Sequence, residues 1–441
     1  MSYLKKINDN YYIYAILIFV FIPINFIPQL WDSVVFIYGF EIRDITGIEN
    51  HFKEGSRYIH LLSIYLVYFL TKLTSLPADI FIDNLIIIFL ILFCVEVKKI
   101  SKILFGLENK WCNLAALFTA IFPVWHVLVA FQLGEHLASF YFLLFGYRNF
   151  ISKKKINILV GLFFIFLSFN TESALSFVVG LIVVSLLSEK VNNEHDFSVS
   201  IFKLIIIILS CLVYYFIIRG LFFSPYGLRE NYNTVIWSDL ANIIEIKLLK
   251  NILNYLTYAF LFIWIPVIFF IHILFLNKNH FSKIKLNFKY NNNYFLLIIL
   301  FVFAIFPYLI LNKSSHILYL SDYYQRHAFL LAPISGMFFS IMFRDMAKIN
   351  CLQNKVNLNF YLTIFVCINL VLLNYGNYRK IESHLFRTNL SQELMAYGSI
   401  PKGNVLFIGK NIPAQLRQHE LNYLLYKAYN IAGWWSTPFG S

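Results

Sequence analysis

Charge is scarce in this sequence. Only 13% of its 441 residues are Asp, Glu, Lys or Arg, whereas 59% are hydrophobic. A soluble domain carries about 25% charged and about 45–50% apolar residues, so this composition excludes a large soluble domain. The sequence instead predicts a polytopic membrane protein.

Sequence motifs for metals, nucleotides and disulfides are also missing. The five cysteines lie within or beside apolar runs without paired spacing, so we expect neither a disulfide framework nor a zinc site. There is no Gly-rich phosphate loop, Walker motif or HExxH sequence, and nothing suggests a nucleotide bound on the cytoplasmic side. No cofactor is therefore expected, although a divalent metal requirement is not excluded.

The formal net charge of +13 has a topological explanation. In a soluble protein such an excess would suggest nucleic acid as a partner. Here the basic residues sit in short loops between apolar runs, which is the pattern of cytoplasmic loops in membrane proteins. We expect the bilayer, and no nucleic acid, as a partner.

A membrane-spanning helix needs about twenty apolar residues. Candidate spans begin near residues 11, 82, 112, 133, 157, 174, 201, 252, 294, 327 and 357. The segment 57–73, "RYIHLLSIYLVYFLTKL", is ambiguous because its apolar stretch is short and interrupted by His60, Tyr65, Tyr68 and Lys72. Such a helix either crosses the membrane or lies in its surface.

The basic loops decide between these two possibilities. If 57–73 does not cross, almost every cytoplasmic loop is rich in Lys and Arg, as the positive-inside rule requires. These cytoplasmic segments are 1–10, 97–110, 148–156, 188–203, 277–293 and 344–356. The sequence therefore predicts about eleven spans with additional juxtamembrane helices at the outer face, an N-terminus inside and a C-terminus outside.

This topology places four polar stretches on the outer face, namely 31–59, 219–250, 312–326 and 376–441. We expect a transmembrane domain over 1–375 and a small extracytoplasmic α/β appendage over 376–441. In the appendage, 401–410 has the pattern of a strand and 413–435 the pattern of a helix that begins at Pro413.

The first candidate site follows the first span. Asp32 ends that span, and Glu41, Asp44 and Arg57 lie in the loop "WDSVVFIYGFEIRD" and its continuation. A carboxylate there is consistent with a helix simply reaching water. It also suits a general base for a lipid-borne substrate, since partial burial would raise its pKa toward neutrality.

Three further outer positions carry candidate residues. Glu135 and His136 lie in the short turn "FQLGEHLASF", and Glu172 interrupts apolar sequence in "SFNTESALSF". An ionisable residue at a span end is a functional candidate, although both places also fit ordinary polar turns. The fourth position is "NKSSHILYLSDYYQRHAFLL", with Lys313, His316, Asp322, Arg326 and His327 among tyrosines. Its cations suit either lipid headgroups or a phosphate, which the arginine fork binds well.

The arrangement resembles the C-type glycosyltransferases, integral membrane enzymes that use polyprenyl-phosphate-linked sugars. In that superfamily an acidic residue follows the first span, in an outer loop with two juxtamembrane helices; "WDSVVFIYGFEIRD" and "EGSRYIHLLSIYLVYFL" stand in those places. The stretch "GSRYIHLL" is also similar to the "GRPL" region of serotype-converting O-antigen glucosyltransferases. Those enzymes often carry two adjacent aspartates, where this chain has Asp32 and Ser33.

Two more motifs extend the resemblance over roughly residues 1–345. The turn "LGEHLASF" is similar to the second acidic position of the superfamily, which maps to Glu135. "LSFNTESALSF" resembles the "YQ-x-A" turn of the serotype enzymes, with Glu172 where Gln is common.

The resemblance implies transfer of a sugar from a polyprenyl-phosphate donor to a surface glycan, lipid or protein, at the outer face of a bacterial inner membrane. Asp32 would be the base, with Glu135 and His136 at the acceptor, and Arg326 with Arg57 or Lys313 at the donor phosphate. Glu41, Asp44, Glu172, Asp322 and His327 are further substrate-binding candidates. A glycan-lipid transporter and a polysaccharide polymerase are the alternative functions.

Overall fold

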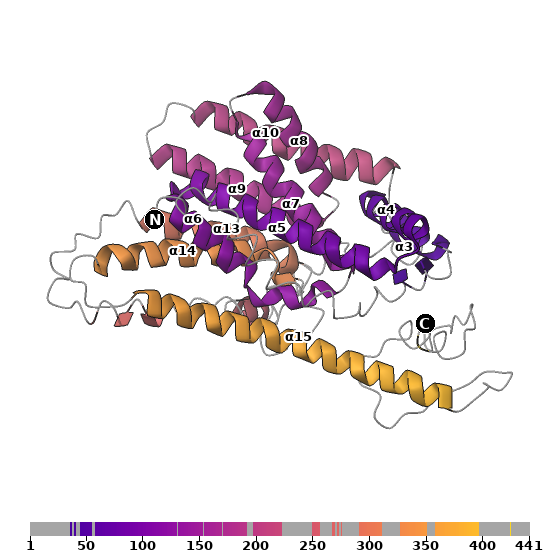
Figure 1. Cartoon of the computed structure of the whole chain (residues 1–441). Helices are drawn as coiled ribbons and strands as arrows, with labels where there is room; N and C mark the ends of the chain where they lie inside the picture. Colours follow the sequence, from indigo (N-terminus) through magenta and orange to yellow (C-terminus); the bar gives the residue numbers. More distant parts are fainter. Residues whose placement is uncertain are drawn as a thin grey trace, which may run out of the picture.

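The computed structural model is a bundle of helices (Figure 1). It describes residues 36–37, 39–40, 45–54, 58–129, 131–152, 154–169, 171–191, 197–222, 249–255, 267–269, 271–272, 275, 291–310, 327–350, 358–396 and 424. Within these residues all regular structure is helical and no strand occurs. The prediction of an all-α membrane domain is confirmed to this extent. The strand at 401–410 lies outside the described residues.

The elements follow one another along the chain with short connections. In order they are α3 (Thr46–Glu54), α4 (Tyr58–Thr74), α5 (Ala78–Phe105), α6 (Asn109–Ala120), η3 (Pro123–Val129), α7 (Phe131–Phe150), α8 (Lys155–Ser168), α9 (Glu172–Val191), α10 (Phe197–Leu212), η4 (Val213–Phe222), α13 (Asn291–Ile310), α14 (Leu331–Asn350) and α15 (Leu358–Ala396). The segment η3 is a 3-10 helix and η4 is a π-helix.

Three of the described helices are long and apolar enough to cross a membrane: Ala78–Phe105, Asn292–Ile310 and Asn359–Glu393. Shorter apolar helices cover His60–Thr74, Lys155–Ser168, Ser173–Ser188 and Ile201–Tyr215. This content indicates a membrane protein. The predicted number of about eleven spans stays a prediction, and the first of them, near residue 11, lies outside the described residues.

Helix α5 is central to the bundle and its ends are marked in the sequence. It begins after Pro77 and ends at Gly106, which takes the left-handed conformation with φ 60°. The Gly106 N–H donates to the Lys102 carbonyl at 3.0 Å, which closes the last turn as glycine caps usually do. Helix α5 packs against α6 and α7, and α6 packs against α14.

Glycines allow the closest helix contacts. A Cβ on Gly161 of α8 would lie 2.7 Å from the Gly146 carbonyl oxygen of α7. A Cβ on Gly336 of α14 would lie 2.5 Å from the Ala115 carbonyl oxygen of α6. Small residues at such crossings let helix backbones approach, which is how membrane helices gain packing contacts.

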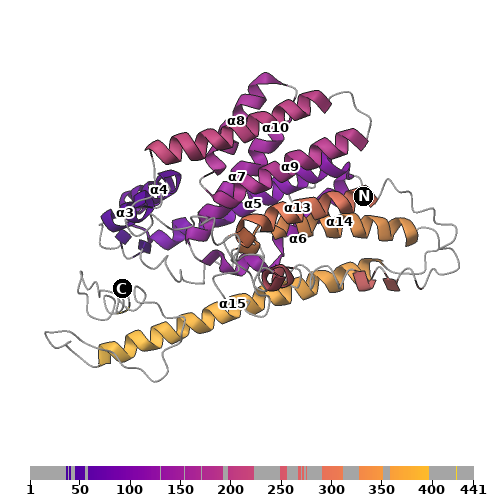
Figure 2. The same cartoon turned by 180° about the vertical axis from the view of Figure 1, so that it is seen from behind.

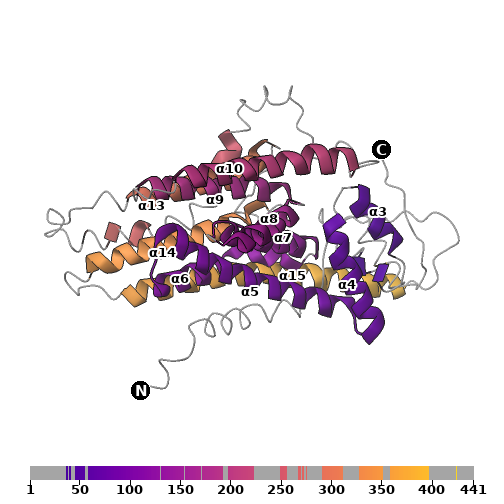
Figure 3. The same cartoon turned by 90° about the horizontal axis from the view of Figure 1, so that it is seen from above.

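Helix α4 lies crosswise to α5 at one end of the bundle, with α3 beside it (Figures 1 and 3). We call this the α3–α4 end. The outward face of α4 is apolar, and it exposes Leu62, Leu66, Phe69 and Leu73 by 46–68%. An apolar stripe on a crosswise helix is the arrangement expected of a helix that lies in a membrane surface. The predicted surface position of residues 57–73 is consistent with this geometry.

Helix α15 is longer than a bilayer requires. Its 39 residues extend over about 58 Å, against a hydrocarbon core of about 30 Å. It runs along one side of the bundle, and its C-terminal part reaches toward the α3–α4 end (Figures 1 and 2). The predicted domain boundary between 375 and 376 falls inside α15, which continues without interruption to Ala396. A separate appendage starting at 376 would divide this helix.

Candidate functional site at the α3–α4 end

Aromatic side chains hold α3 on α4. The rings of Phe36 and Phe52 stack with centroids 5.5 Å apart, and Phe52 stacks on His60 of α4 at 5.7 Å. Phe36 and Phe52 are each at most 2% exposed, and His60 is 4% exposed. The stack therefore buries an imidazole, a group with two polar nitrogens, beneath the short helix α3.

Three polar side chains from distant parts of the sequence meet next to this stack. The His60 ring lies edge-on to His136 of α7, with centroids 6.2 Å apart. The His136 Nδ1 lies 3.3 Å from the Thr171 hydroxyl, immediately before α9, and Thr171 is buried. We call His60, His136 and Thr171 the histidine cluster. It joins α4, α7 and the start of α9.

The histidine cluster brings together two acidic positions that the sequence analysis treated separately. Glu135 precedes His136 in the first turns of α7, and Glu172 follows Thr171 as the first residue of α9. Their backbones therefore flank the contact between His136 and Thr171. His136, predicted as a substrate-binding residue, is half-buried and lies at the centre of the cluster.

A second polar contact ties α3 to α4. Glu49 accepts a hydrogen bond from the Lys53 ammonium at 3.1 Å and another from the Tyr65 hydroxyl. The Lys53 bond is the largest cause of a Glu49 pKa below its ordinary value of 4.5, and the Tyr65 bond adds to it. The same bond to Glu49 raises the pKa of Tyr65. Glu49 is thus an ionised group that fastens the two helices together, and a poor proton acceptor.

The other predicted site residues have different outcomes. His327 is 3% exposed, and its ring lies 4.8 Å from the Tyr308 ring of α13. It is therefore packed between helices at the start of the segment that leads into α14. The remaining candidates lie outside the described residues: Asp32, Glu41, Asp44, Arg57, Lys313, Asp322 and Arg326.

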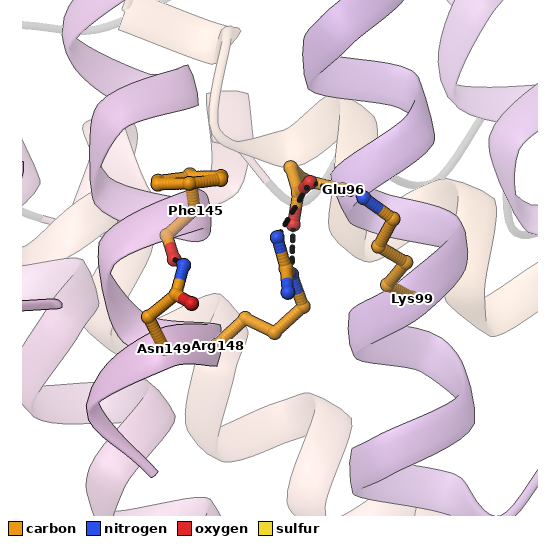
Figure 4. A network of polar contacts seen from close by, with 5 residues as sticks. All are labelled: Glu96, Lys99, Phe145, Arg148 and Asn149. Carbon is orange, nitrogen blue, oxygen red and sulfur yellow. Dashed lines mark hydrogen bonds and ion pairs between the residues drawn. The ribbon is translucent and has the colours of Figure 1, made fainter. Parts of the chain in front are cut away.

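The sequence analysis missed a buried ion-pair network between α5 and α7 (Figure 4). The Glu96 carboxylate is 3% exposed and receives Arg148 Nε at 2.6 Å and Nη2 at 3.3 Å. Lys99 donates to the other side of the same carboxylate at 2.7 Å. The signal was present as a lone Glu within the apolar run of α5, four residues before the basic loop.

The analysis also missed buried polar groups on α15 and η3. Lys380 is 2% exposed and Arg387 is 6% exposed, and both lie in the part of α15 assigned to the appendage. His126 of η3 is 1% exposed. The signal here was helical spacing, because Asn377, Lys380 and Arg387 fall on one face of a continuous helix.

Within the described residues there is no group of three or more His, Cys, Asp or Glu side chains that could hold a metal ion. The histidine cluster supplies two imidazoles and a hydroxyl. These groups can donate or accept hydrogen bonds and can move a proton near neutral pH.

Comparison of the chain with protein-family models, with curated proteins and with solved structures gives no match. The function is therefore argued from the residues and their arrangement.

Proposed function

We propose that this protein transfers a sugar from a polyprenyl-phosphate donor to a hydroxyl group of a glycan, lipid or protein at the outer face of a bacterial inner membrane. The observation that carries the proposal is the histidine cluster, which brings the acidic positions Glu135 and Glu172 together at the α3–α4 end. An enzyme for lipid-linked substrates needs polar chemistry at the membrane surface, and the apolar outward face of α4 supports that placement.

The reaction exchanges one glycosidic bond for another. The acceptor oxygen attacks the anomeric carbon, the bond from that carbon to the phosphate oxygen breaks, and the electron pair leaves with the phosphate. The acceptor proton passes to a carboxylate, for which Asp32 and Glu135 are the candidates. His136 orients the acceptor hydroxyl, and Arg326 with Arg57 or Lys313 stabilises the phosphate.

The topology that fits this reaction has a cytoplasmic N-terminus and an extracytoplasmic tail. In that orientation the α3–α4 end faces outward, and the Glu96 network lies toward the cytoplasm. The lipid donor then meets its acceptor without either entering the cell.

The test compares surface glycans of cells that contain or lack the gene, complemented with wild-type protein or variants. Asp32→Asn and Glu135→Gln are expected to lose transfer by about 10²–10⁴-fold if each moves a proton in the reaction. Glu108→Gln, an exposed carboxylate before α6, is the matched control and is expected to stay active. Identical glycans with and without the gene would refute the proposal.

A glycan-lipid transporter is the second candidate function. Transporters carry ionisable groups inside the bundle, and Glu96, Lys380 and Arg387 are buried charges of this kind. Detergent-purified protein separates the two functions, because a transferase joins donor and acceptor in a micelle whereas a transporter has no chemical product there.

A further inference from the structure

The second half of α15 is polar on its buried face and apolar on its exposed face. Its buried side chains after residue 376 are Asn377, Lys380, Arg387 and Ser391, each at most 9% exposed. Its exposed side chains include Tyr375, Tyr378, Ile381 and Leu385, which are 42–61% exposed. This pattern is the reverse of a helix on a soluble domain.

Burial of two cations on one helix face needs compensation. Transfer of an ammonium or guanidinium group out of water is costly unless anionic or hydrogen-bonding groups surround it. In membrane proteins such charges face the bundle interior and mark a ligand path. Lys380 and Arg387 therefore point to a site that receives negative charge.

The Arg387 side chain folds back along α15. Its Nη1 donates to the Ser383 carbonyl oxygen at 2.9 Å and also contacts the Ser383 hydroxyl. The guanidinium therefore lies near the level of Ser383, three residues beyond Lys380, which corresponds to a rise of about 4.5 Å along the helix. The two cations are close enough along the axis to face one bound phosphate.

The segment η3 supplies a hydrogen-bond acceptor beside them. The His126 Nδ1 lies 2.5 Å from the Pro123 carbonyl oxygen, which can only accept, so the proton resides on Nδ1. The Nε2 then carries the lone pair, and it has no hydrogen-bond partner among the described residues. The Asn377 side-chain oxygen, also buried, likewise has no hydrogen-bond partner in the described part of the chain.

Gly376 brings these groups together. A Cβ at this position would lie 2.6 Å from the His126 Cγ, so η3 contacts the α15 backbone directly. Asn377 is the next residue, and Lys380 lies one turn further, near enough to act electrostatically on the His126 ring. We call His126, Asn377, Lys380 and Arg387 the α15 site.

We propose that the α15 site binds a hydroxyl-bearing phosphate group carried by a lipid. Lys380 and Arg387 hold the phosphate oxygens, and hydroxyl groups beside the phosphate donate to His126 Nε2 and Asn377 Oδ1. Two lipids offer this chemistry. One is the glycosyl phosphate of a polyprenyl donor, which rests on the proposed function, and the other is a phosphoglycerol headgroup of the bilayer, which does not.

Binding to the purified full-length protein in detergent tests the site. The probes are a polyprenyl-phosphate hexose, the same polyprenyl phosphate without sugar, and phosphatidylglycerol, each measured by native mass spectrometry over a concentration series. Lys380→Gln and Arg387→Gln are expected to weaken binding of the preferred probe by about tenfold to hundredfold, as loss of a charged hydrogen bond does. Arg379→Gln is the matched control, because Arg379 is 42% exposed and pairs with Glu382 on the same helix.

Two further variants separate hydroxyl recognition from phosphate binding. Asn377→Leu and His126→Phe are expected to weaken binding of the hexose-bearing probe and to leave the sugar-free polyprenyl phosphate unchanged. Gly376→Ala removes no charge but forces η3 away from α15, and it is expected to weaken all probes that bind there. Thermal unfolding of each variant without lipid shows that the loss is not caused by misfolding.

The outcomes distinguish the source of the ligand. Dependence of the hexose probe on Lys380 and Arg387 supports the site with the sugar donor as its ligand, even if the same preparation transfers no sugar. Dependence of phosphatidylglycerol alone supports the site with a bilayer lipid, and transfer activity is then judged by its own assay. Wild-type affinity of Lys380→Gln and Arg387→Gln for all three probes overturns the proposal.

Discussion

The Glu96 network predicts a large effect from one small substitution. Glu96→Gln keeps the size of the side chain but removes the charge that faces Arg148 and Lys99. Removal of one member of a buried ion pair costs about 3–5 kcal/mol, because the remaining charge stays buried without compensation. Arg148 is 25% exposed, so water partly compensates it and the lower figure of about 3 kcal/mol applies.

That loss of free energy is measurable as a shift of the unfolding temperature. An unfolding entropy of about 2 cal/mol/K per residue converts about 3 kcal/mol into a fall of about 3 °C for this chain. The assay is thermal unfolding of purified protein in detergent. Glu382→Gln is the matched control, since Glu382 is 51% exposed and its pair with Arg379 contributes at most about 1 kcal/mol.

A double variant shows whether the effect comes from the pair itself. Glu96→Gln with Arg148→Gln removes the same interaction twice, so its destabilisation is expected to be smaller than the sum of the two single variants. The reasoning is refuted if Glu96→Gln unfolds at the same temperature as Glu382→Gln, or if the two single effects simply add.

Three other predictions concern packing, membrane depth and pH. Gly161→Ala is expected to lower the unfolding temperature, because its Cβ would lie 2.7 Å from the Gly146 carbonyl oxygen and force α7 and α8 apart; an unchanged temperature would contradict the close contact. A tryptophan in the variant Leu66→Trp is expected to be quenched by lipids brominated near the headgroup more than by lipids brominated at the chain ends, and the reverse order would place α4 across the bilayer. The contribution of Glu49 to stability is present above its ordinary pKa of 4.5 and is lost as the pH falls through its lower folded value. Wild-type protein is therefore expected to lose more unfolding temperature between pH 6 and 3 than Glu49→Gln, and equal losses would refute the contact.

The sequence carried enough information for the helical class and for the long apolar helices. Apolar runs of sufficient length and their glycine and proline boundaries predict elements such as α5, which ends at Gly106. The unusual composition of residues 57–73 also singled out the helix that lies crosswise to α5 as α4. These are local properties, because length, hydropathy and capping depend on neighbouring residues.

Contacts between distant residues could not be predicted in the same way. Nothing in the local sequence says that His60, His136 and Thr171 meet, since their proximity depends on how α4, α7 and α9 pack. Lys380 and Arg387 were assigned to an appendage because the sequence becomes more polar after residue 376. Their burial follows from α15 remaining one helix, with its polar face turned inward.

The buried charges differ in whether their hydrogen-bonding capacity is already used, and this difference separates structural from ligand-binding groups. Both oxygens of Glu96 are occupied by Arg148 and Lys99, so a passing ligand would have to break an existing ion pair. His126 Nε2 and Asn377 Oδ1 have no hydrogen-bond partner within the described residues, although each is buried. A buried acceptor without a donor is costly, and a ligand hydroxyl would recover that cost. The Glu96 network is therefore best understood as a fastening between α5 and α7. The interior polarity that a transporter and a transferase would share is better sought along α15 than along α5.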